Sequence, residues 1–259
     1  ILENKKGYQN NETLQRVLTL GGIQQFNNGN FLKASDLFKN GLRVRGNKTW
    51  EAFCLYWYGR SEYERNKFDE SLELFNQFEK HAEKKNVDSE YRLNYDIGYV
   101  YFKLGEYQSA LRFFEIFNET NSVLDVSYQR DTYLRIGDCQ FALSKYWDAM
   151  KNYNRSILLN PKKGDYASFQ KAISYGFVDR NSKKINALLK FLITYPENEL
   201  LDDVLFELAS AQSRAGENEK AIETYDKLIS VFERSPFLAK AALNKGLILY
   251  NLEEYDLAK

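Results

Sequence analysis

The 259-residue chain carries 36 Lys plus Arg and 36 Asp plus Glu, which gives a formal net charge of zero. A dedicated nucleic-acid-binding protein usually has a basic excess, so this balance argues against that function. Hydrophobic residues make up 44% of the chain and charged residues 28%, which is enough to build a core. No apolar run approaches the roughly 20 residues that cross a bilayer. We therefore expect a folded chain with no nucleic-acid partner and no transmembrane segment.

Few residues are available for metal or thiol chemistry. The sequence has one histidine, His81, and two cysteines, Cys54 and Cys139, so a histidine-based metal site or a disulfide framework has almost nothing to form from. It contains no Walker-type glycine-rich loop, no G-x-S-x-G elbow and no H-E-x-x-H motif. We expect no metal, no cofactor and no catalytic residue, and hence a protein that is not an enzyme.

The composition favours helices. The chain has only 14 Gly and 3 Pro but 19 Tyr and 18 Phe, a profile typical of long helices that pack through aromatic rings. Self-similarity at a period of 34 to 39 residues then divides the chain into seven repeats, with starts near residues 15, 52, 91, 130, 168, 202 and 239. The prediction is an all-α fold built from helical hairpins.

Three positions recur when each repeat is numbered so that its glycine is position 8. Position 8 is occupied by Gly22, Gly59, Gly98, Gly137, Tyr175, Ala209 and Gly246. Position 20 is occupied by Ala34, Ser71, Ala110, Ala149, Ala187, Ala221 and Ala258. Position 24 is occupied by Phe38, Phe75, Phe114, Tyr153, Phe191 and Tyr225. Gly in a helix costs about 0.5 to 1 kcal/mol relative to Ala, so its recurrence indicates that two antiparallel helices approach closely there, with the position-24 ring filling the space beside them.

These residues resemble the tetratricopeptide repeat, in which a Leu-Gly pair, an aromatic residue, an Ala and a Phe recur in fixed order before a Pro. The resemblance covers nearly the whole chain. It implies a single α-solenoid over residues 1–259, wound as a right-handed superhelix of about seven hairpins and truncated at both ends, with residues 1–14 as the tail of a preceding repeat. Repeat five departs from the pattern, because Tyr175 replaces the glycine and Gly176 follows one residue late, and we expect an altered helix geometry there.

The resemblance also implies where a partner binds, because positions 2, 5, 9, 12 and 13 of the first helices line the concave groove in such a superhelix. The candidate partner-binding residues are Phe53, Tyr56, Arg60, Arg92, Tyr95, Tyr99, Lys103, Asp131, Leu134 and Asp138. Tyr and Arg are enriched among the residues that dominate binding energy at interfaces. Tyr63, Phe102 and Phe141 at position 12 are interpreted as packing residues. The expected partner is a protein or a peptide.

Residues 195–237 bear a further resemblance, to the bacterial envelope branch of the family, in which Tyr-Pro or Ser-Pro stands between hairpins as Tyr195-Pro196 and Ser235-Pro236 do here. It implies a non-enzymatic scaffold in an envelope or outer-membrane complex, hence in a membrane-associated assembly, with a periplasmic or outer-membrane-associated location. The alternative is a helical regulatory or specificity arm of a larger cytoplasmic enzyme or sensor.

Overall fold

The computed structural model describes residues 2–87, 90–120, 125–256 and 258, and the side-chain environments from residue 10 onward. Within these residues the chain forms thirteen α-helices, three short 3₁₀ helices and no strand. The predicted all-α solenoid of helical hairpins is confirmed. Contacts divide the chain into an N-terminal unit, Ile1–Val123, and a C-terminal unit, Leu124–Lys259, and each is described by itself. That all of residues 1–259 form one uninterrupted solenoid stays a prediction.

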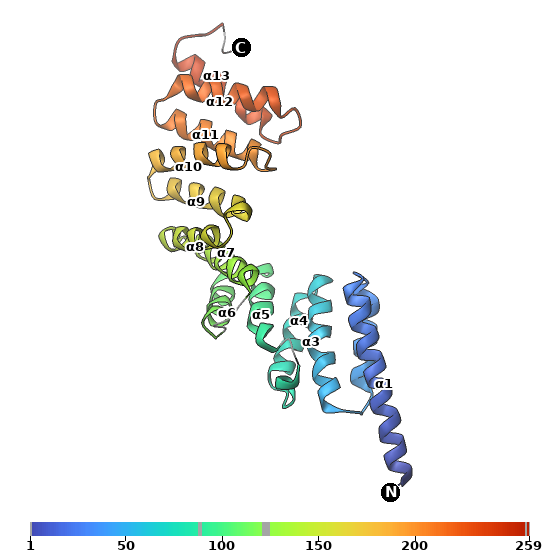
Figure 1. Ribbon diagram of the computed structural model, residues 1–259. Coiled ribbons are helices and arrows are strands. Elements are labelled where there is room, and N and C mark those ends of the chain that lie inside the picture. Colours follow the sequence, from blue (N-terminus) through green and yellow to red (C-terminus); the bar gives the residue numbers. More distant parts are fainter. Residues whose placement is uncertain (1, 88–89, 121–124, 257, 259) are drawn as a thin grey trace. The chain divides into compact units, whose positions relative to one another are not determined.

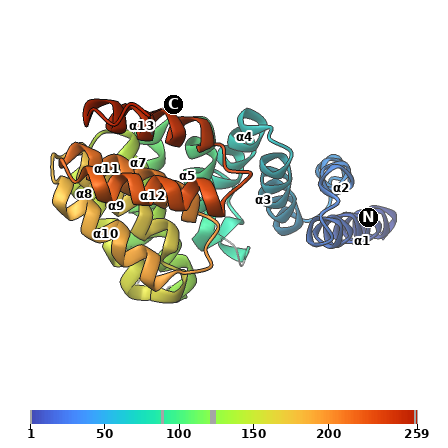
Figure 2. The same ribbon diagram turned by 90° about the horizontal axis from the view of Figure 1, so that it is seen from above.

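The helices of the N-terminal unit are α1 (Leu2–Asn27), α2 (Phe31–Arg43), α3 (Lys48–Glu64), α4 (Phe68–Glu79), η1 (Lys84–Asn86), η2 (Glu90–Arg92), α5 (Leu93–Lys103) and α6 (Tyr107–Thr120). Those of the C-terminal unit are α7 (Val126–Ala142), α8 (Tyr146–Leu159), η3 (Pro161–Lys163), α9 (Asp165–Phe177), α10 (Asn181–Thr194), α11 (Leu201–Arg214), α12 (Asn218–Val231) and α13 (Leu238–Asn251). Within each unit, helices that are consecutive in the chain lie against one another, as Figures 1 and 2 show. The repeats are therefore the pairs α1/α2, α3/α4, α5/α6, α7/α8, α9/α10 and α11/α12, followed by α13.

The turn after the first helix of each repeat, α13 included, passes through one residue in the left-handed region. These residues have φ between 55° and 76° and are Gly29, Asn66, Gly105, Ser144, Asp179, Gly216 and Glu253. Such a residue commonly ends a helix, because it lets the next backbone groups bond back to the last carbonyls. Each stands seven positions after the residue at position 8, so it marks the register of its repeat.

This marker corrects the register of repeat five. Asp179 lies seven residues after Ala172, which is fully buried, so position 8 is Ala172 and the repeat starts at residue 165, not near 168. The nitrogen of Arg180 donates to the carbonyl of Tyr175 at 2.9 Å, as that of Glu106 does to Tyr101 in repeat three at 3.0 Å. The turn of repeat five therefore follows the common geometry, and the altered helix geometry expected for this repeat stays a prediction.

The close approach at position 8 is confirmed in the first four repeats. A Cβ added to Gly98 would lie 2.9 Å from the Phe114 ring, and one added to Gly137 would lie 2.7 Å from the ring of Tyr153. Those rings are fully buried, and so are Ala110 and Ala149 at position 20. The core of each of these four hairpins is thus a close helix contact beside one buried ring.

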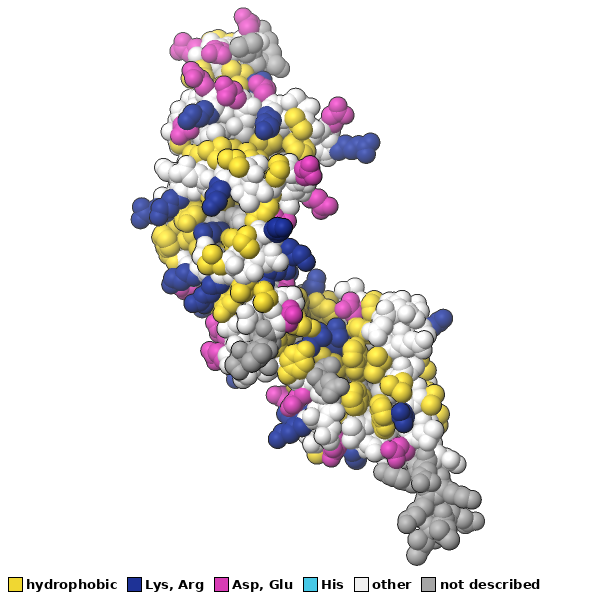
Figure 3. Space-filling model, in the orientation of Figure 1, with side chains coloured by type: hydrophobic (Ala, Val, Ile, Leu, Met, Phe, Trp, Pro, Cys, Tyr) yellow, Lys and Arg dark blue, Asp and Glu magenta, His cyan; other side chains and the backbone are white. Residues whose placement is uncertain are grey.

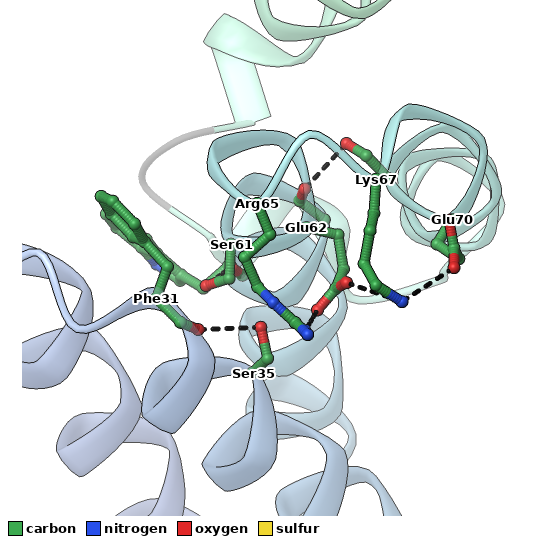
Figure 4. A network of polar contacts seen from close by, with 10 residues as sticks. Phe31, Ser35, Ser61, Glu62, Arg65, Lys67 and Glu70 are labelled. Carbon is green, nitrogen blue, oxygen red and sulfur yellow. Dashed lines mark hydrogen bonds and ion pairs between the residues drawn. The ribbon is translucent and has the colours of Figure 1, made fainter.

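A charged network fixes the turn of repeat two (Figure 4). Glu62 is only 1% exposed, and its carboxylate accepts a hydrogen bond from Arg65 Nη1 at 2.7 Å and lies 3.9 Å from Lys67 Nζ. The backbone nitrogen of Lys67 also donates a hydrogen bond to the Glu62 carbonyl at 2.8 Å. A buried carboxylate that is paired in this way is structurally tolerable, so we assign the network to the α3–α4 turn.

Residues 2–14 are helical and continuous with the rest of α1. The tail of a preceding repeat would need a turn before residue 15, because a second helix and the next first helix are antiparallel neighbours. Here no turn interrupts α1, so residues 2–14 extend the first helix of repeat one instead.

Candidate partner-binding pocket on repeats two and three

A pocket of about 170 Å³ opens in the N-terminal unit between the first helices of repeats two and three. Its lining residues come from α3, α4, η2 and α5, and are Arg60, Tyr63, Glu64, Phe75, Arg92, Tyr95, Asp96 and Tyr99. We call it the Arg60–Tyr99 pocket. Four of the residues proposed from the sequence, Arg60, Arg92, Tyr95 and Tyr99, meet here.

Helical spacing explains why these side chains converge. Arg60, Tyr63 and Glu64 are three and four residues apart on α3, and so share one face of that helix. Tyr95 and Tyr99 are one turn apart on α5. The pocket thus forms where the exposed faces of two first helices meet above Phe75, the buried position-24 ring of repeat two.

Aromatic contacts hold the walls of the pocket. The Tyr95 and Tyr99 ring centroids are 4.9 Å apart, and Tyr63 meets Tyr99 at 6.4 Å in an edge-to-face arrangement. Tyr99 also packs edge-on against Phe114 at 5.3 Å, and Tyr95 lies 5.0 Å from Phe117. Pairs of this geometry add roughly 0.5 to 1.5 kcal/mol beyond burial, so both tyrosines are positioned before any partner arrives.

Arg60 is held by cation–π contacts. Its guanidinium carbon lies 4.9 Å from the Phe26 ring centroid and 5.1 Å from that of Trp57. Stacking of this kind fixes the plane of an arginine and leaves its N–H edge available for hydrogen bonds to a carboxylate or a carbonyl.

A buried tyrosine orients the acidic side of the pocket. The Tyr56 hydroxyl donates to Asp96 Oδ2, and Arg92 Nη2 lies 3.7 Å from Asp96 Oδ1. Burial, reinforced by the charge of Asp96, raises the pKa of Tyr56 well above its usual value, so the phenol stays protonated and remains a donor. Asp96 in turn holds Arg92 at the rim of the pocket.

This arrangement corrects the assignment of Tyr56 as a groove residue. Its side chain is fully buried, within 5.3 Å of the Phe78 ring and 6.0 Å of the Phe75 ring, measured between centroids. A partner cannot reach it without opening the repeat, so Tyr56 acts only through Asp96.

Phe53 and Lys103 lie outside the pocket. Phe53 is half-buried and packs on Trp50 with ring centroids 5.4 Å apart. Lys103 is exposed in the last turn of α5. Neither lines the cavity, and a role for them in binding stays a prediction.

The three candidates of repeat four belong to the C-terminal unit. Leu134 is buried with Ala149, Tyr153 and Ala167, so its assignment to a binding surface was wrong. Asp138 is also buried, and accepts hydrogen bonds from the Tyr153 hydroxyl at 3.0 Å and from Arg135 Nη1 at 2.9 Å. Asp131 alone is half-exposed, with Arg135 Nε 3.6 Å from its Oδ1.

The buried position of Asp138 changes its acidity. Desolvation raises the pKa of its carboxyl from 3.8 to about 6, although Arg135 and the hydrogen bond from Tyr153 act in the opposite direction. Asp138 is thus a polar core residue that orients Arg135 and Tyr153, and its assignment to the groove was wrong.

Sequence reasoning missed Glu64, Phe75 and Asp96, and it interpreted Tyr63 as a packing residue only, although all four line the pocket. Asp96 carried a usable signal, because it stands four residues after Arg92 and opposite charges at that spacing pair on a helix surface.

The part of the chain that the structure describes offers neither a cluster of metal-ligand side chains nor a membrane-spanning helix. No group of three or more His, Cys, Asp or Glu side chains is placed as a set of metal ligands there. None of the helices in that part of the chain combines the length and the apolar character needed to cross a membrane.

Comparisons with known proteins agree with this architecture. Two family models, both described as tetratricopeptide repeat, match residues 58–117 and 203–235. The chain therefore contains tetratricopeptide repeats. No curated protein matches its sequence. The first matched segment contains all eight residues that line the Arg60–Tyr99 pocket.

Solved structures of tetratricopeptide-repeat proteins share the fold. One from Parabacteroides merdae is 16% identical with a TM-score of 0.66, covering 95% of this chain and 90% of its own. YrrB, described as having an unusual peptide-binding site, is 17% identical with a TM-score of 0.60, covering 79% of this chain and 96% of its own. A signal-transduction ATPase with a tetratricopeptide-repeat sensor, from Pyrococcus horikoshii, is 13% identical with a TM-score of 0.72, covering 92% of this chain and 40% of its own.

Proposed function

We propose that this chain is a non-enzymatic interaction scaffold that captures a segment of a partner protein in the Arg60–Tyr99 pocket. The observation that carries the proposal is the pocket itself, in which two arginines and three tyrosines surround a cavity on the scale of one large side chain. Tyr and Arg are the residue types that most often dominate interface energies. Peptide binding by the structurally similar YrrB supports the same class of function.

The chemistry of the pocket indicates what the captured segment contains. Rings of Tyr63, Tyr95 and Tyr99 suit an aromatic or aliphatic side chain, and the guanidinium of Arg60 suits a neighbouring carboxylate or carbonyl. Glu64 and Asp96 balance the two arginines formally, so the pocket has no net charge. We therefore expect binding that depends only modestly on salt.

The cellular setting is a second part of the proposal. The resemblance of residues 195–237 to envelope-type repeats supports a role within a bacterial envelope or outer-membrane complex. The alternative, a regulatory arm of a larger enzyme or sensor, is supported by the likeness to the repeat-containing sensor of a signal-transduction ATPase.

Affinity capture from native cells, read by quantitative mass spectrometry, tests both parts. The pocket variant combines Arg60→Gln with Tyr99→Leu, which removes the charge and the hydroxyl while Leu keeps an apolar contact with Phe114. The matched control combines Lys39→Gln with Tyr91→Leu, which removes one charge and one tyrosine at exposed sites outside the pocket. We expect the partner to be lost from the pocket variant only.

Equal recovery by both variants would contradict the assignment of the pocket. Recovery with outer-membrane proteins, together with a processed or lipidated N-terminal peptide, would support the envelope role. Recovery with soluble enzymes and an uncleaved N-terminus would favour the regulatory arm.

A further inference from the structure

A second cavity, separate in sequence and chemistry from the Arg60–Tyr99 pocket, lies in the C-terminal unit. It is a groove of about 490 Å³ whose lining comes from α8, the η3 turn, α9 and α10. The second helices of repeats four and five contribute most of its walls. The groove residues of α9 include Lys171 and Tyr175, at positions 7 and 11 of repeat five. The Arg60–Tyr99 pocket uses other positions of the first helices, so the two sites lie on different helix faces.

The groove is lined by cations without carboxylates. Lys171, Lys183 and Lys190 all contribute to its lining, and no Asp or Glu does. Among the described residues, none of these three lysines forms an ion pair with a carboxylate. Burial and the charge of Lys190 lower the pKa of Lys171, as expected for a cation that is partly desolvated beside another cation.

The surrounding sequence has the same bias. Residues 149–196 contain nine Lys or Arg and only two acidic residues, Asp165 and Asp179, an excess of seven positive charges in a chain whose net charge is zero. In Figure 3, Lys and Arg side chains surround hydrophobic ones on the middle of the C-terminal unit. A concentrated excess of one sign attracts a ligand of the opposite sign.

Contacts within the groove position two of its three lysines and join two of its walls. Lys171 Nζ donates to Asn154 Oδ1 at 2.8 Å, which links α9 to α8. Lys183 Nζ lies 5.9 Å from the centroid of the Tyr175 ring. The Tyr195 hydroxyl donates to the Pro161 carbonyl at 2.8 Å and ties the end of α10 to the η3 turn.

The remaining lining favours a polypeptide over a polyphosphate. Ile157, Leu158, Ala187 and Phe191 give the groove an apolar component, and the Leu158 side chain is 71% exposed. A phosphate backbone gains nothing from such a surface, whereas a peptide can place an apolar side chain on it. Asn186 and Thr194 on α10 supply donors and acceptors for a peptide main chain.

We propose that this groove binds an acidic peptide segment in which Asp or Glu residues flank an apolar side chain. The carboxylates contact Lys171, Lys183 and Lys190, and the apolar side chain packs on Leu158. From Lys183 to Thr194, α10 spans about 16 Å, which an extended peptide of about five residues covers. The inference does not rest on the Arg60–Tyr99 pocket, and each site can fail independently of the other.

The test uses fluorescence anisotropy of the full chain with a fluorescein-labelled peptide, Asp-Glu-Leu-Glu-Asp-Phe-Glu-Glu, at physiological ionic strength. A control peptide replaces every Asp with Asn and every Glu with Gln. The groove variant is Lys171→Gln, Lys183→Gln and Lys190→Gln, in which Gln can keep a hydrogen bond to Asn154. The matched control removes three exposed lysines elsewhere, through Lys33→Gln, Lys39→Gln and Lys227→Gln.

We expect the acidic peptide alone to bind, the groove variant to bind it about tenfold or more weakly, and the control variant to bind it as the unchanged chain does. Leu158→Ser should weaken binding several-fold, although it changes no charge. Far-UV circular dichroism and thermal melting should be the same for all variants.

Three results would overturn the inference. The first is an absence of binding, or equal losses in the groove and control variants. The second is tighter binding of an oligouridylate of equal length that is also lost in the groove variant, since the groove would then be a nucleic-acid site. The third is concentration-dependent self-association that the groove variant abolishes, since residues 197–259 carry thirteen acidic and seven basic residues and would then be the occupant in a second copy.

Discussion

Repeats three and five have different residue types at positions 8, 20 and 24 of the hairpin. Repeat three has Gly98, Ala110 and Phe114, whereas repeat five has Ala172, Lys184 and Leu188. All six residues are buried, and both turns have a residue in the left-handed region at the same place. The hairpin therefore depends on the total volume at these positions and on the turn, and not on one set of residues.

The buried lysine is the strongest departure. Lys184 is only 3% exposed, and its Nζ forms an ion pair with Glu207 of α11. Its stem passes over Gly176, where an added Cβ would lie 3.2 Å from Lys184 Cδ. Repeat three has Phe102 at the position of Gly176, so it offers no path for such a stem. Repeat five thus needs Gly176 and Glu207 together to hold a charge in its core.

The largest expected effect comes from placing the position-20 lysine of repeat five at the same position of repeat three. Ala110→Lys buries a charge at a fully closed position, and should lower the free energy of unfolding by more than about 4 kcal/mol. Ala110→Ser is the control, because repeat two has Ser71 there with its hydroxyl donating to the Gly59 carbonyl at 2.7 Å; it should cost less than about 1 kcal/mol. Urea unfolding followed by circular dichroism measures both. Similar costs would show that position 20 is more adaptable than its burial indicates.

Breaking the ion pair of repeat five should have the next largest effect. Glu207→Ala leaves Lys184 buried without its carboxylate, and should destabilise the hairpin by about 3 kcal/mol. Adding Lys184→Met to Glu207→Ala removes the stranded charge at similar volume and should recover most of that loss. Hydrogen exchange of the α9 and α10 amides reports the local stability. If Lys184→Met does not restore the stability lost in Glu207→Ala, the unpaired charge of Lys184 is not the cause of the loss.

Asp138 of repeat four extends the comparison to a titratable group. Because folding raises its pKa from 3.8 to about 6, the folded state holds the proton more tightly. The stabilisation is complete below the unfolded pKa and is lost as the pH rises through about 6. Asp138→Asn cannot titrate, so the unfolding free energy of the unchanged chain minus that of the variant should fall by about 2 kcal/mol between roughly pH 4 and pH 7. A difference that stays level with pH would contradict the raised pKa.

The smallest expected effect concerns the turns. Gly105 adopts φ 76° in repeat three, whereas Asp179 adopts φ 55° in repeat five. Asp179→Gly should stabilise its repeat by roughly 0.5 kcal/mol, and Gly105→Ala should destabilise its repeat by about 1 kcal/mol. Thermal melting of the two variants gives the signs. A loss of stability in Asp179→Gly would show that the Asp side chain contributes to the turn.

The sequence was sufficient for the fold because small residues at positions 8 and 20 face a large one at position 24 in most repeats. It misplaced repeat five by three residues, because Ala187 and Phe191 match positions 20 and 24 of the pattern better than Lys184 and Leu188 do. Asp179 also does not look like a left-handed turn residue. Glycine at three of the other turns made those easy to place.

The candidate site was only partly predictable for a related reason. Helical spacing predicted that Arg92, Tyr95 and Tyr99 share one face, and the structure brings Arg60 to them. Tyr56 and Asp138 occupy groove positions in their repeats, yet both are covered by neighbouring helices. Exposure at those positions depends on how adjacent hairpins pack, and the position of a residue within its repeat does not predict that packing.

The pairing of helices that are adjacent in the chain limits how far the effect of binding spreads through the molecule. Because contacts are mostly local, each hairpin forms and opens largely by itself and is coupled mainly to its neighbours. A partner held at Arg60 and Tyr99 should therefore slow amide exchange in α3 and α5 most strongly. The protection from amide exchange should fade within about one hairpin on either side. Binding at one site should therefore change the stability of nearby helices only.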